Sequence, residues 1–379
     1  MHKLAWMCGI GLVGACAAAP GGGPDPDTAV ATSDSLAYRP MGFARITETG
    51  AVAVAFDSAS TLASPVTASH STGNYSVTFA GLAAPSLTDA TGGDVQLTAE
   101  GTSSVRCRVL GWGGSPDLTV SVQCNQAAGA LADSGFSVAF FRDAMPAPNS
   151  FPTASAYSWV TAAGGVSALY DYNASGAHNT VTRTTGSYAL TIPGATAVNA
   201  SMMVTPYSGS GAGAACSIVN WFAATSPSRV IASIECRNAG NQLVDSAFSF
   251  SYATTGPTFD QQGAHAWFDG SAANPTYSAA LGKIEGCSPA SVTATAGTPV
   301  VVTVSGELGP WDASPFLRAS LASKYGAAGY CKIESLTATA PPPPTTATTK
   351  VRCYDATGAA IAAPRFTFTH LTSDASGPC

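Results

Sequence analysis

Cysteines are the residues of this 379-residue chain whose type and spacing could do chemistry. Paired thiols either oxidise to a disulfide or hold a metal ion, and zinc sites usually show CxxC spacing or clustered histidines. The chain has no CxxC, and its five histidines are scattered. Six of the ten cysteines therefore predict three disulfides and an oxidising compartment: Cys107–Cys124, Cys216–Cys236 and Cys331–Cys353.

A proline lies at or beside the midpoint of each cysteine pair. The midpoints fall at Ser115-Pro116, at Ser226 beside Pro227, and at Pro342. Proline favours turns and cannot donate to a strand ladder, so each pair predicts two antiparallel strands joined by a loop. Residues equidistant from such a turn face each other. The facing pairs beside the cysteines are all β-branched, which suits a packed strand face: Val109–Val122, Ile218–Ile234 and Ile333–Val351.

Four cysteines stand outside these hairpins. Cys8 and Cys16 lie in the N-terminal leader, and Cys287 and Cys379 remain. We expect Cys287 and Cys379 to bridge each other. This fourth pair rests on elimination, because neither residue lies in a matched hairpin.

The N-terminus has the pattern of a bacterial signal peptide. Met-His-Lys precedes an apolar stretch from Leu4 to Ala15, which is shorter than the ~20 residues of a transmembrane helix. The run Leu12-Val13-Gly14-Ala15-Cys16 resembles a lipobox. That resemblance implies cleavage of residues 1–15 and acylation of Cys16 at its thiol and new amino terminus. Ordinary secretion with cleavage nearby is the alternative.

Residues 16–36 are small, with glycine and proline runs, and predict a flexible tether beyond the lipidated cysteine. Two or more acyl chains would anchor the protein stably. No Asp follows Cys16, which by resemblance to Gram-negative sorting favours an outer membrane over the inner one. We expect a lipid-anchored protein of the bacterial cell envelope, at the outer membrane or cell surface.

Composition limits the partners and the number of domains. Only 10% of the residues are charged and the net charge is −6. The chain has no basic block, which argues against nucleic-acid binding. Removing residues 1–15 from 379 leaves 364 residues, a length that suits about three domains.

Three repeats surround the hairpins, over residues 37–142 (repeat 1), 155–254 (repeat 2) and 262–379 (repeat 3). Each predicts about seven short strands, and the clearest show the period-2 alternation of a half-buried strand. The sequence predicts an all-β chain of three tandem immunoglobulin-like β-sandwich domains, each with a disulfide-clamped hairpin. Short proline-rich joints predict a string of domains with limited flexing.

The predicted strands recur in the same order in each repeat. The opening strands are Phe43–Ile46, Tyr157–Val160 and His265–Phe268. A second set is Tyr75–Phe79, Tyr188–Ile192 and Val300–Val304. A third is Val95–Thr98, Ser201–Val204 and Phe316–Ala319. The closing strands are Phe136–Phe140, Phe248–Tyr252 and Phe366–His370.

The pattern resembles an uncharacterised family of secreted or lipid-anchored repeat proteins from high-GC bacteria. The residues that carry the resemblance are Gly-x-Tyr at Gly73–Tyr75 and Gly186–Tyr188, a Trp after the first cysteine, and Asp-Ser-x-Phe at Asp133–Phe136 and Asp245–Phe248. Repeat 3 departs from it, with Leu336 for the Trp and Ala362-Ala363 for Asp-Ser. The family implies no known activity.

Trp112 and Trp221 each stand five residues after a cysteine. An odd offset puts them on the opposite strand face from the cysteine unless a bulge intervenes. They are either ligand-facing aromatics, forming a platform for a glycan or peptide, or packed rings, and we favour packing because large aromatics are mostly buried. The two Asp-Ser pairs are expected to hydrogen-bond their own backbone in a turn.

No sequence motif indicates catalysis. GxSxG, HExxH, P-loop and EF-hand patterns are missing, and no histidine recurs among the repeats. We expect no enzyme activity, cofactor or metal, and a structural or binding role such as adhesion or envelope scaffolding. The partners would be the membrane, through the lipid anchor, and a glycan or envelope protein. The alternative function is a secreted hydrolase or its carbohydrate-binding accessory module.

Overall fold

The computed structural model describes residues 41–59, 66–83, 92–142, 155–195, 200–207, 213–254, 263–270, 277–281, 291–307, 318–338 and 345–372. The leader, the tether and the predictions for Cys16, Cys287 and Cys379 lie outside these residues. The described part contains 24 strands and no helix, so the all-β prediction is confirmed. It accordingly has no helix long and apolar enough to cross a membrane.

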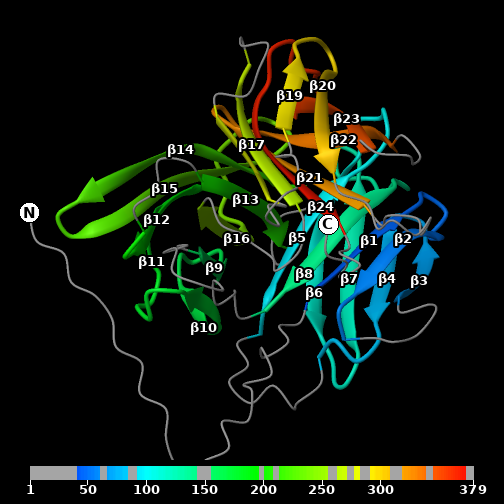
Figure 1. Cartoon of the computed structure of the whole chain (residues 1–379). Coiled ribbons are helices and arrows are strands. Elements are labelled where there is room, and N and C mark those ends of the chain that lie inside the picture. The colour runs from blue at the N-terminus through cyan, green and yellow to red at the C-terminus, as the bar shows by residue number, and fades with distance from the viewer. Residues whose placement is uncertain are drawn as a thin grey trace, which may run out of the picture. The chain divides into compact units, whose positions relative to one another are not determined.

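The described part of each repeat contains eight strands, which Figure 1 labels in chain order. Repeat 1 contains β1 (Met41–Ile46), β2 (Val52–Asp57), β3 (Val66–Ser71), β4 (Asn74–Phe79), β5 (Asp94–Ala99), β6 (Arg106–Gly113), β7 (Leu118–Asn125) and β8 (Phe136–Phe141). Repeat 2 contains β9 (Ser155–Val160), β10 (Val166–Asn173), β11 (Thr180–Thr184), β12 (Ser187–Pro193), β13 (Ala200–Tyr207), β14 (Ala215–Thr225), β15 (Ser228–Arg237) and β16 (Ala247–Thr254). Repeat 3 contains β17 (Gly263–Asp269), β18 (Tyr277–Leu281), β19 (Ser291–Thr295), β20 (Val300–Glu307), β21 (Arg318–Tyr325), β22 (Gly329–Ala338), β23 (Thr345–Asp355) and β24 (Arg365–Thr372).

The strands form four sheets, two of which cross repeat boundaries. The four-stranded sheets β2-β1-β8-β5 and β19-β20-β23-β22 each belong to one repeat. The eight-stranded sheets are β10-β9-β16-β13-β6-β7-β4-β3 and β11-β12-β15-β14-β21-β24-β17-β18. Each eight-stranded sheet takes four strands from one repeat and four from the next. The expected string of separate domains is therefore wrong, because neighbouring repeats share sheets.

Each repeat packs its own apolar core between strands of two sheets. In repeat 1, Val77 and Phe79 of β4 face the same cluster as Val138 and Phe140 of β8, and all four side chains are buried. Corresponding clusters lie within repeats 2 and 3. The alternation of buried and half-buried residues along β4 and β12 is the sequence pattern that predicted them. The result is a sandwich-like packing of β-sheets.

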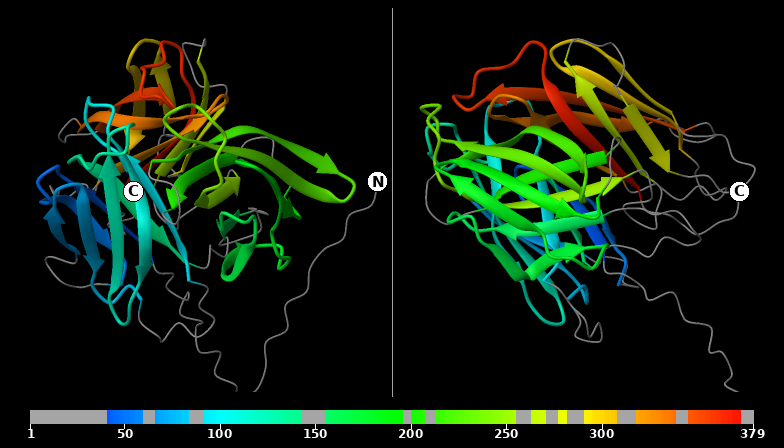
Figure 2. Two further views of the ribbon diagram at one scale, coloured as in Figure 1. Left: turned by 180° about the vertical axis from the view of Figure 1, so that it is seen from behind. Right: turned by 90° about the vertical axis from the view of Figure 1, so that its left-hand side faces the viewer.

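The three cysteine hairpins are present with the predicted register. β6 pairs with β7, β14 with β15 and β22 with β23, all antiparallel, and each joins its cysteines in a disulfide. The Cα–Cα distances of the bridged cysteines are 4.0, 4.0 and 3.9 Å. The predicted β-branched neighbours also face each other, and all six are buried. The β14–β15 hairpin extends well beyond the neighbouring strands (Figure 2).

Three parallel contacts link the repeats in a closed cycle. Val109 of β6 pairs with Tyr207 of β13, and Ile218 of β14 pairs with Tyr325 of β21. The third contact joins Ile333 of β22 back to Glu100, just after β5. Val109, Ile218 and Ile333 each lie two residues after the first cysteine of their hairpin. The same position in every repeat therefore contacts another repeat.

A matching cycle of hydroxyl bonds joins the inner strands. Thr205 Oγ1 accepts a hydrogen bond from the amide of Leu97 at 2.9 Å. Ser323 Oγ accepts one from the amide of Val204 at 3.1 Å. Thr98 Oγ1 accepts one from the amide of Ala322 at 3.0 Å, which closes the cycle. The donors Leu97, Val204 and Ala322 directly precede Thr98, Thr205 and Ser323 in the chain. The three bonds are therefore equivalent, and β5, β13 and β21 have an approximate threefold arrangement.

Candidate functional site

Trp112 lies at the contact between repeats 1 and 2. Its ring meets Tyr170 and Tyr207 edge-on, with centroid distances of 5.2 and 5.5 Å. Its Nε1 donates to the carbonyl of Gly92 at 2.9 Å. Trp159 contacts the same two tyrosines. The indole is partly buried, and its neighbours include two tyrosines of repeat 2.

Trp221 has the equivalent place between repeats 2 and 3. Its ring meets Tyr325 at 4.9 Å and Trp267 at 6.0 Å, both edge-on. Edge-to-face pairs of this kind contribute ~0.5–1.5 kcal/mol beyond burial. The structure thus places both sequence-predicted aromatics in ring clusters that join repeats.

A one-residue bulge explains which way these rings face. The pairing of β6 with β7 shifts between Val109 and Gly111, and that of β14 with β15 shifts between Ile218 and Asn220. Each bulge lies between the cysteine and the tryptophan, so it returns the tryptophan to the face of the cysteine. Trp112 accordingly packs against the core cluster of repeat 1. The sequence offset alone predicted the opposite face.

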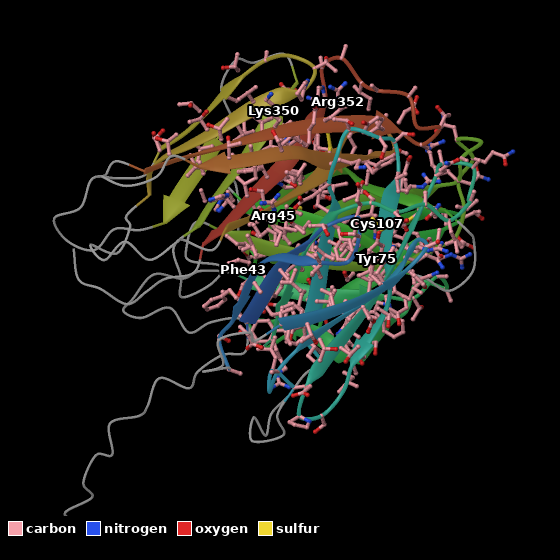
Figure 3. The ribbon with its side chains drawn as sticks, turned by 90° about the vertical axis from the view of Figure 1, so that its right-hand side faces the viewer. Phe43, Arg45, Tyr75, Cys107, Lys350 and Arg352 are labelled. Carbon is pink, nitrogen blue, oxygen red and sulfur yellow. A yellow bond between two sulfur atoms is a disulfide. The ribbon has the colours of Figure 1, made fainter. Side chains whose placement is uncertain are left out.

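The contact between repeats 3 and 1 has Leu336 at the tryptophan position and charged side chains nearby. Within repeat 1, Arg45 binds Glu100, the residue that pairs with Ile333 of repeat 3, through Nε at 3.0 Å and Nη2 at 2.8 Å (Figure 3 labels Arg45). This pairing raises the pKa of Arg45. Lys332 is fully buried and donates to the carbonyl of Ser103 at 2.9 Å. Leu336, which replaces the tryptophan here, packs against the core of repeat 3.

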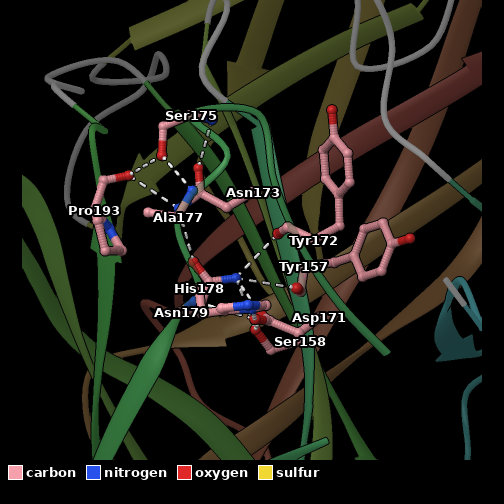
Figure 4. A network of polar contacts seen from close by, with 10 residues as sticks. All are labelled: Tyr157, Ser158, Asp171, Tyr172, Asn173, Ser175, Ala177, His178, Asn179 and Pro193. Carbon is pink, nitrogen blue, oxygen red and sulfur yellow. Dashed lines mark hydrogen bonds and ion pairs between the residues drawn. The ribbon is translucent and has the colours of Figure 1, made fainter. Parts of the chain in front are cut away.

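A histidine, an aspartate and a serine meet in repeat 2, but not as a catalytic triad (Figure 4). His178 Nδ1 lies 3.1 Å from Oδ2 of the buried Asp171. Ser158 Oγ donates to Asp171 Oδ1 at 2.9 Å, and Asn179 Nδ2 donates to the same oxygen at 2.7 Å. In a triad the serine must bond the imidazole, which takes its proton. Here Ser158 is buried and bonds the carboxylate, so the network fixes the β10–β11 connection.

The Asp-Ser pairs form hydrogen bonds with the Gly-x-Tyr turn, which is distant in the chain; no sequence pattern predicted these bonds. Asp133 Oδ1 accepts from the amide of Gly73 at 2.7 Å and lies 2.8 Å from His70 Nε2. These bonds lower the pKa of Asp133, with His70 the larger cause. The amide of Ser134 donates to the hydroxyl of Tyr75 at 3.1 Å. The Asp-Ser and Gly-x-Tyr motifs thus bind each other, and the expected bonds to their own turn are not the main ones.

Repeat 2 has the same arrangement. Asp245 Oδ1 accepts from the amide of Gly186 at 2.8 Å and binds Arg183. The amide of Ser246 donates to the hydroxyl of Tyr188 at 3.0 Å. Gly73 and Gly186 both have positive φ, 69° and 66°, which suits glycine at the turn. These motif residues are therefore structural.

A cavity of about 30 Å³ lies where the three repeats meet. Each hairpin contributes its first cysteine to the lining, and the inner strands contribute Thr98, Val204 and Ser323. The lining residues Cys107, Cys216 and Cys331 are equivalent members of the three disulfides. The cavity therefore lies where equivalent residues of the three repeats come together.

The cavity is cationic. Arg106, Arg108 and Lys324 line it, and none of its described lining residues is acidic. Arg106 and Lys324 are each only 5% exposed. Burial, with a smaller effect of nearby Arg365, lowers the pKa of Lys324 to about 8. No sequence signal marked this site, because Lys324 lies far along the chain from Arg106 and Arg108 and forms no motif with them.

Two backbone carbonyls and an aromatic ring hold Arg106. Its Nη2 donates to Ala127 O at 3.1 Å and its Nη1 lies 3.4 Å from Ala356 O. The guanidinium carbon is 5.6 Å from the centre of the Tyr330 ring, a cation–π distance. Its Nε has no hydrogen-bond partner among the described residues. One donor of a buried guanidinium thus remains unused.

Neither comparison with known proteins nor a search for groups of metal-binding side chains identifies an activity. The chain matches no family model, no curated protein and no solved structure. Within the described ranges, no three His, Cys, Asp or Glu side chains come together in a group that could hold a metal ion.

Proposed function

We propose that the chain is a lipid-anchored protein of the bacterial cell envelope with a structural or binding role and no catalysis. Its three immunoglobulin-like β-sandwich repeats would form one body held outside the membrane by the tether of residues 16–36. The role would be adhesion or envelope scaffolding, with a glycan or an envelope protein as partner.

The closed cycle of repeat contacts is the observation that carries this proposal. Sheets shared between repeats and three disulfide hairpins suit a body that must stay folded outside the cell. The lipobox at Cys16 supports an anchor. The hydrolase alternative has less support, because Ser158 bonds Asp171 and not His178.

Substitution of the lipobox cysteine tests the anchor. In the native host, Cys16→Ser should move the protein from the membrane fraction to the soluble fraction and abolish labelling by a radioactive fatty acid. Cys8→Ser, in the same leader, is the matched control and should stay lipidated. Membrane retention and labelling of the Cys16→Ser protein would contradict the proposal.

A binding screen tests the role. The purified protein should retain a purified glycan or an envelope protein, and it should hydrolyse neither ester nor glycoside substrates. Hydrolysis that disappears in His178→Ala would support the alternative function instead.

A further inference from the structure

The cavity between the repeats has the composition of an anion site. Arg106 and Lys324 are both more than nine-tenths buried and both line it. A buried cation is costly unless an opposite charge or hydrogen bonds compensate it. The backbone carbonyl of Tyr325 accepts from Lys324 Nζ, but no described carboxylate lines the cavity. The site therefore holds more positive charge than its own lining balances.

We propose that this cavity binds one small carboxylate between Arg106 and Lys324. The ligand would be a formate- or acetate-sized acid, or the carboxylate end of a longer molecule. Carboxylate binding in this cavity does not depend on the proposed lipid anchor or on where in the cell the protein is located.

Size selects a carboxylate over a larger oxyanion. About 30 Å³ corresponds to room for roughly two water molecules, which suits a single carboxylate better than phosphate or sulfate. The guanidinium is planar and suits a carboxylate, and its Nε still lacks an acceptor among the described residues. Cys107 and Arg108 are only partly buried, so a small anion can reach the lining.

The ligand would also join the repeats. Arg106 belongs to repeat 1 and Lys324 to repeat 3, and Ala215 of repeat 2 lies in the same lining. A bound carboxylate would connect charges from two repeats at the point where all three meet. Binding should therefore stabilise the contacts between repeats as well as the two side chains.

Nuclear magnetic resonance and calorimetry test the proposal on the purified full chain. Acetate, titrated against chloride at a constant ionic strength of about 0.1 M, should bind with one site per chain and broaden its methyl resonance. Arg106→Met and Lys324→Met should each weaken acetate binding by about tenfold or more. Lys350→Met, which removes an exposed cation of repeat 3 (Figure 3), should leave it within about twofold.

A further variant and a peptide comparison extend the experiment. Arg108→Gln, at a partly exposed position, should also weaken binding, and it serves if the buried variants do not fold. A short peptide with a free C-terminal carboxylate, compared with its amidated form, shows whether the carboxylate of a longer molecule also enters. The proposal is overturned if acetate does not bind the native protein, if chloride or phosphate binds equally well, or if folded cavity variants keep full affinity.

Discussion

Three buried ionisable side chains lie where the repeats meet. Asp94, Lys324 and Lys332 are each at most 5% exposed. Burial lowers the pKa of Lys332 to about 8 and raises that of Asp94 to about 8. Both changes disfavour the charged form of the side chain, so these two groups contribute to the response of stability to pH.

Asp94 gives a pH prediction. Its Oδ2 accepts from Gln96 Nε2 at 2.7 Å, and the neutral acid is favoured because the carboxyl is buried. The folded pKa lies above the unfolded value, so this stabilising contribution is full below about pH 4 and is lost as pH rises to 8. A tenfold difference between the folded and unfolded acid dissociation constants corresponds to about 1.4 kcal/mol of folding free energy.

Asp94→Asn, which mimics the neutral acid, should therefore gain stability relative to the native protein between pH 4 and pH 8. Denaturant unfolding at several pH values measures the difference. Glu48→Gln, at an exposed position, should follow the native profile. An equal difference between Asp94→Asn and the native protein at pH 4 and pH 8 would rule out the neutral, buried acid.

At the scale of elements, a tyrosine ties the last strand of a repeat to its opening turn. The Tyr188 hydroxyl accepts from the amide of Ser246 and donates to the carbonyl of Ala162 at 3.1 Å. In repeat 1 the Tyr75 hydroxyl makes the same two kinds of bond, to Ser134 and Glu48. The bonds fix the entry to β8 and β16, which lie next to the repeat contacts.

Tyr188→Phe should destabilise the protein by about 1–3 kcal/mol, because it leaves the buried amide of Ser246 without its partner. Tyr170→Phe is the control, since its hydroxyl makes no hydrogen bond with the described residues, and it should change stability little. Chemical denaturation measures both. Equal effects of the two substitutions would show that the Ser246 bond contributes nothing.

Element positions were predictable where local pattern carried the information. The hairpin registers followed from cysteines and β-branched residues placed symmetrically about a turn. The strand face on which Trp112 lies could not be predicted in the same way, because the residue types do not reveal the bulge before it. Of the strand predicted at Phe316–Ala319, the described residues Arg318 and Ala319 belong to β21, and Phe316 and Leu317 lie outside the described residues; the described part shows eight strands per repeat where about seven were predicted. Ser323 lies inside β21 because its hydroxyl bonds the backbone of Val204 in repeat 2, whereas the hydroxyl of Ser320 bonds Thr349 and His370 of its own repeat.

At the scale of the molecule, contacts between repeats were invisible in the sequence. Thr98, Thr205 and Ser323 join the inner strands, yet small hydroxyl residues are common throughout this chain. Phe43, Met203 and Leu321, one from each repeat, also share an apolar cluster. Position along one strand cannot reveal a partner more than a hundred residues away, so the sequence predicted separate domains.

The cycle predicts cooperative unfolding. The repeats should unfold together, in one transition whose calorimetric and van't Hoff enthalpies agree. The double substitution Thr98→Val and Ser323→Ala leaves two buried amides unpaired and should separate the transitions. Thr78→Val, which alters a hydroxyl pair inside repeat 1, should lower the midpoint without splitting the peak. Multiple transitions in the native protein would contradict the cycle.

The charged contact between repeats 3 and 1 also bears on polymerisation. Head-to-tail contacts generate filaments unless the rotation closes them. Here the strand that would capture the next molecule, β22, is occupied by Glu100 of its own chain. At this last contact Lys332 of repeat 3 donates to the carbonyl of Ser103 in repeat 1, and Leu336 takes the place of the tryptophan. Repeat 3 thus offers a surface that differs from the two tryptophan contacts. Because the partner lies in the same chain at high local concentration, we expect this closure to compete with pairing to a second chain.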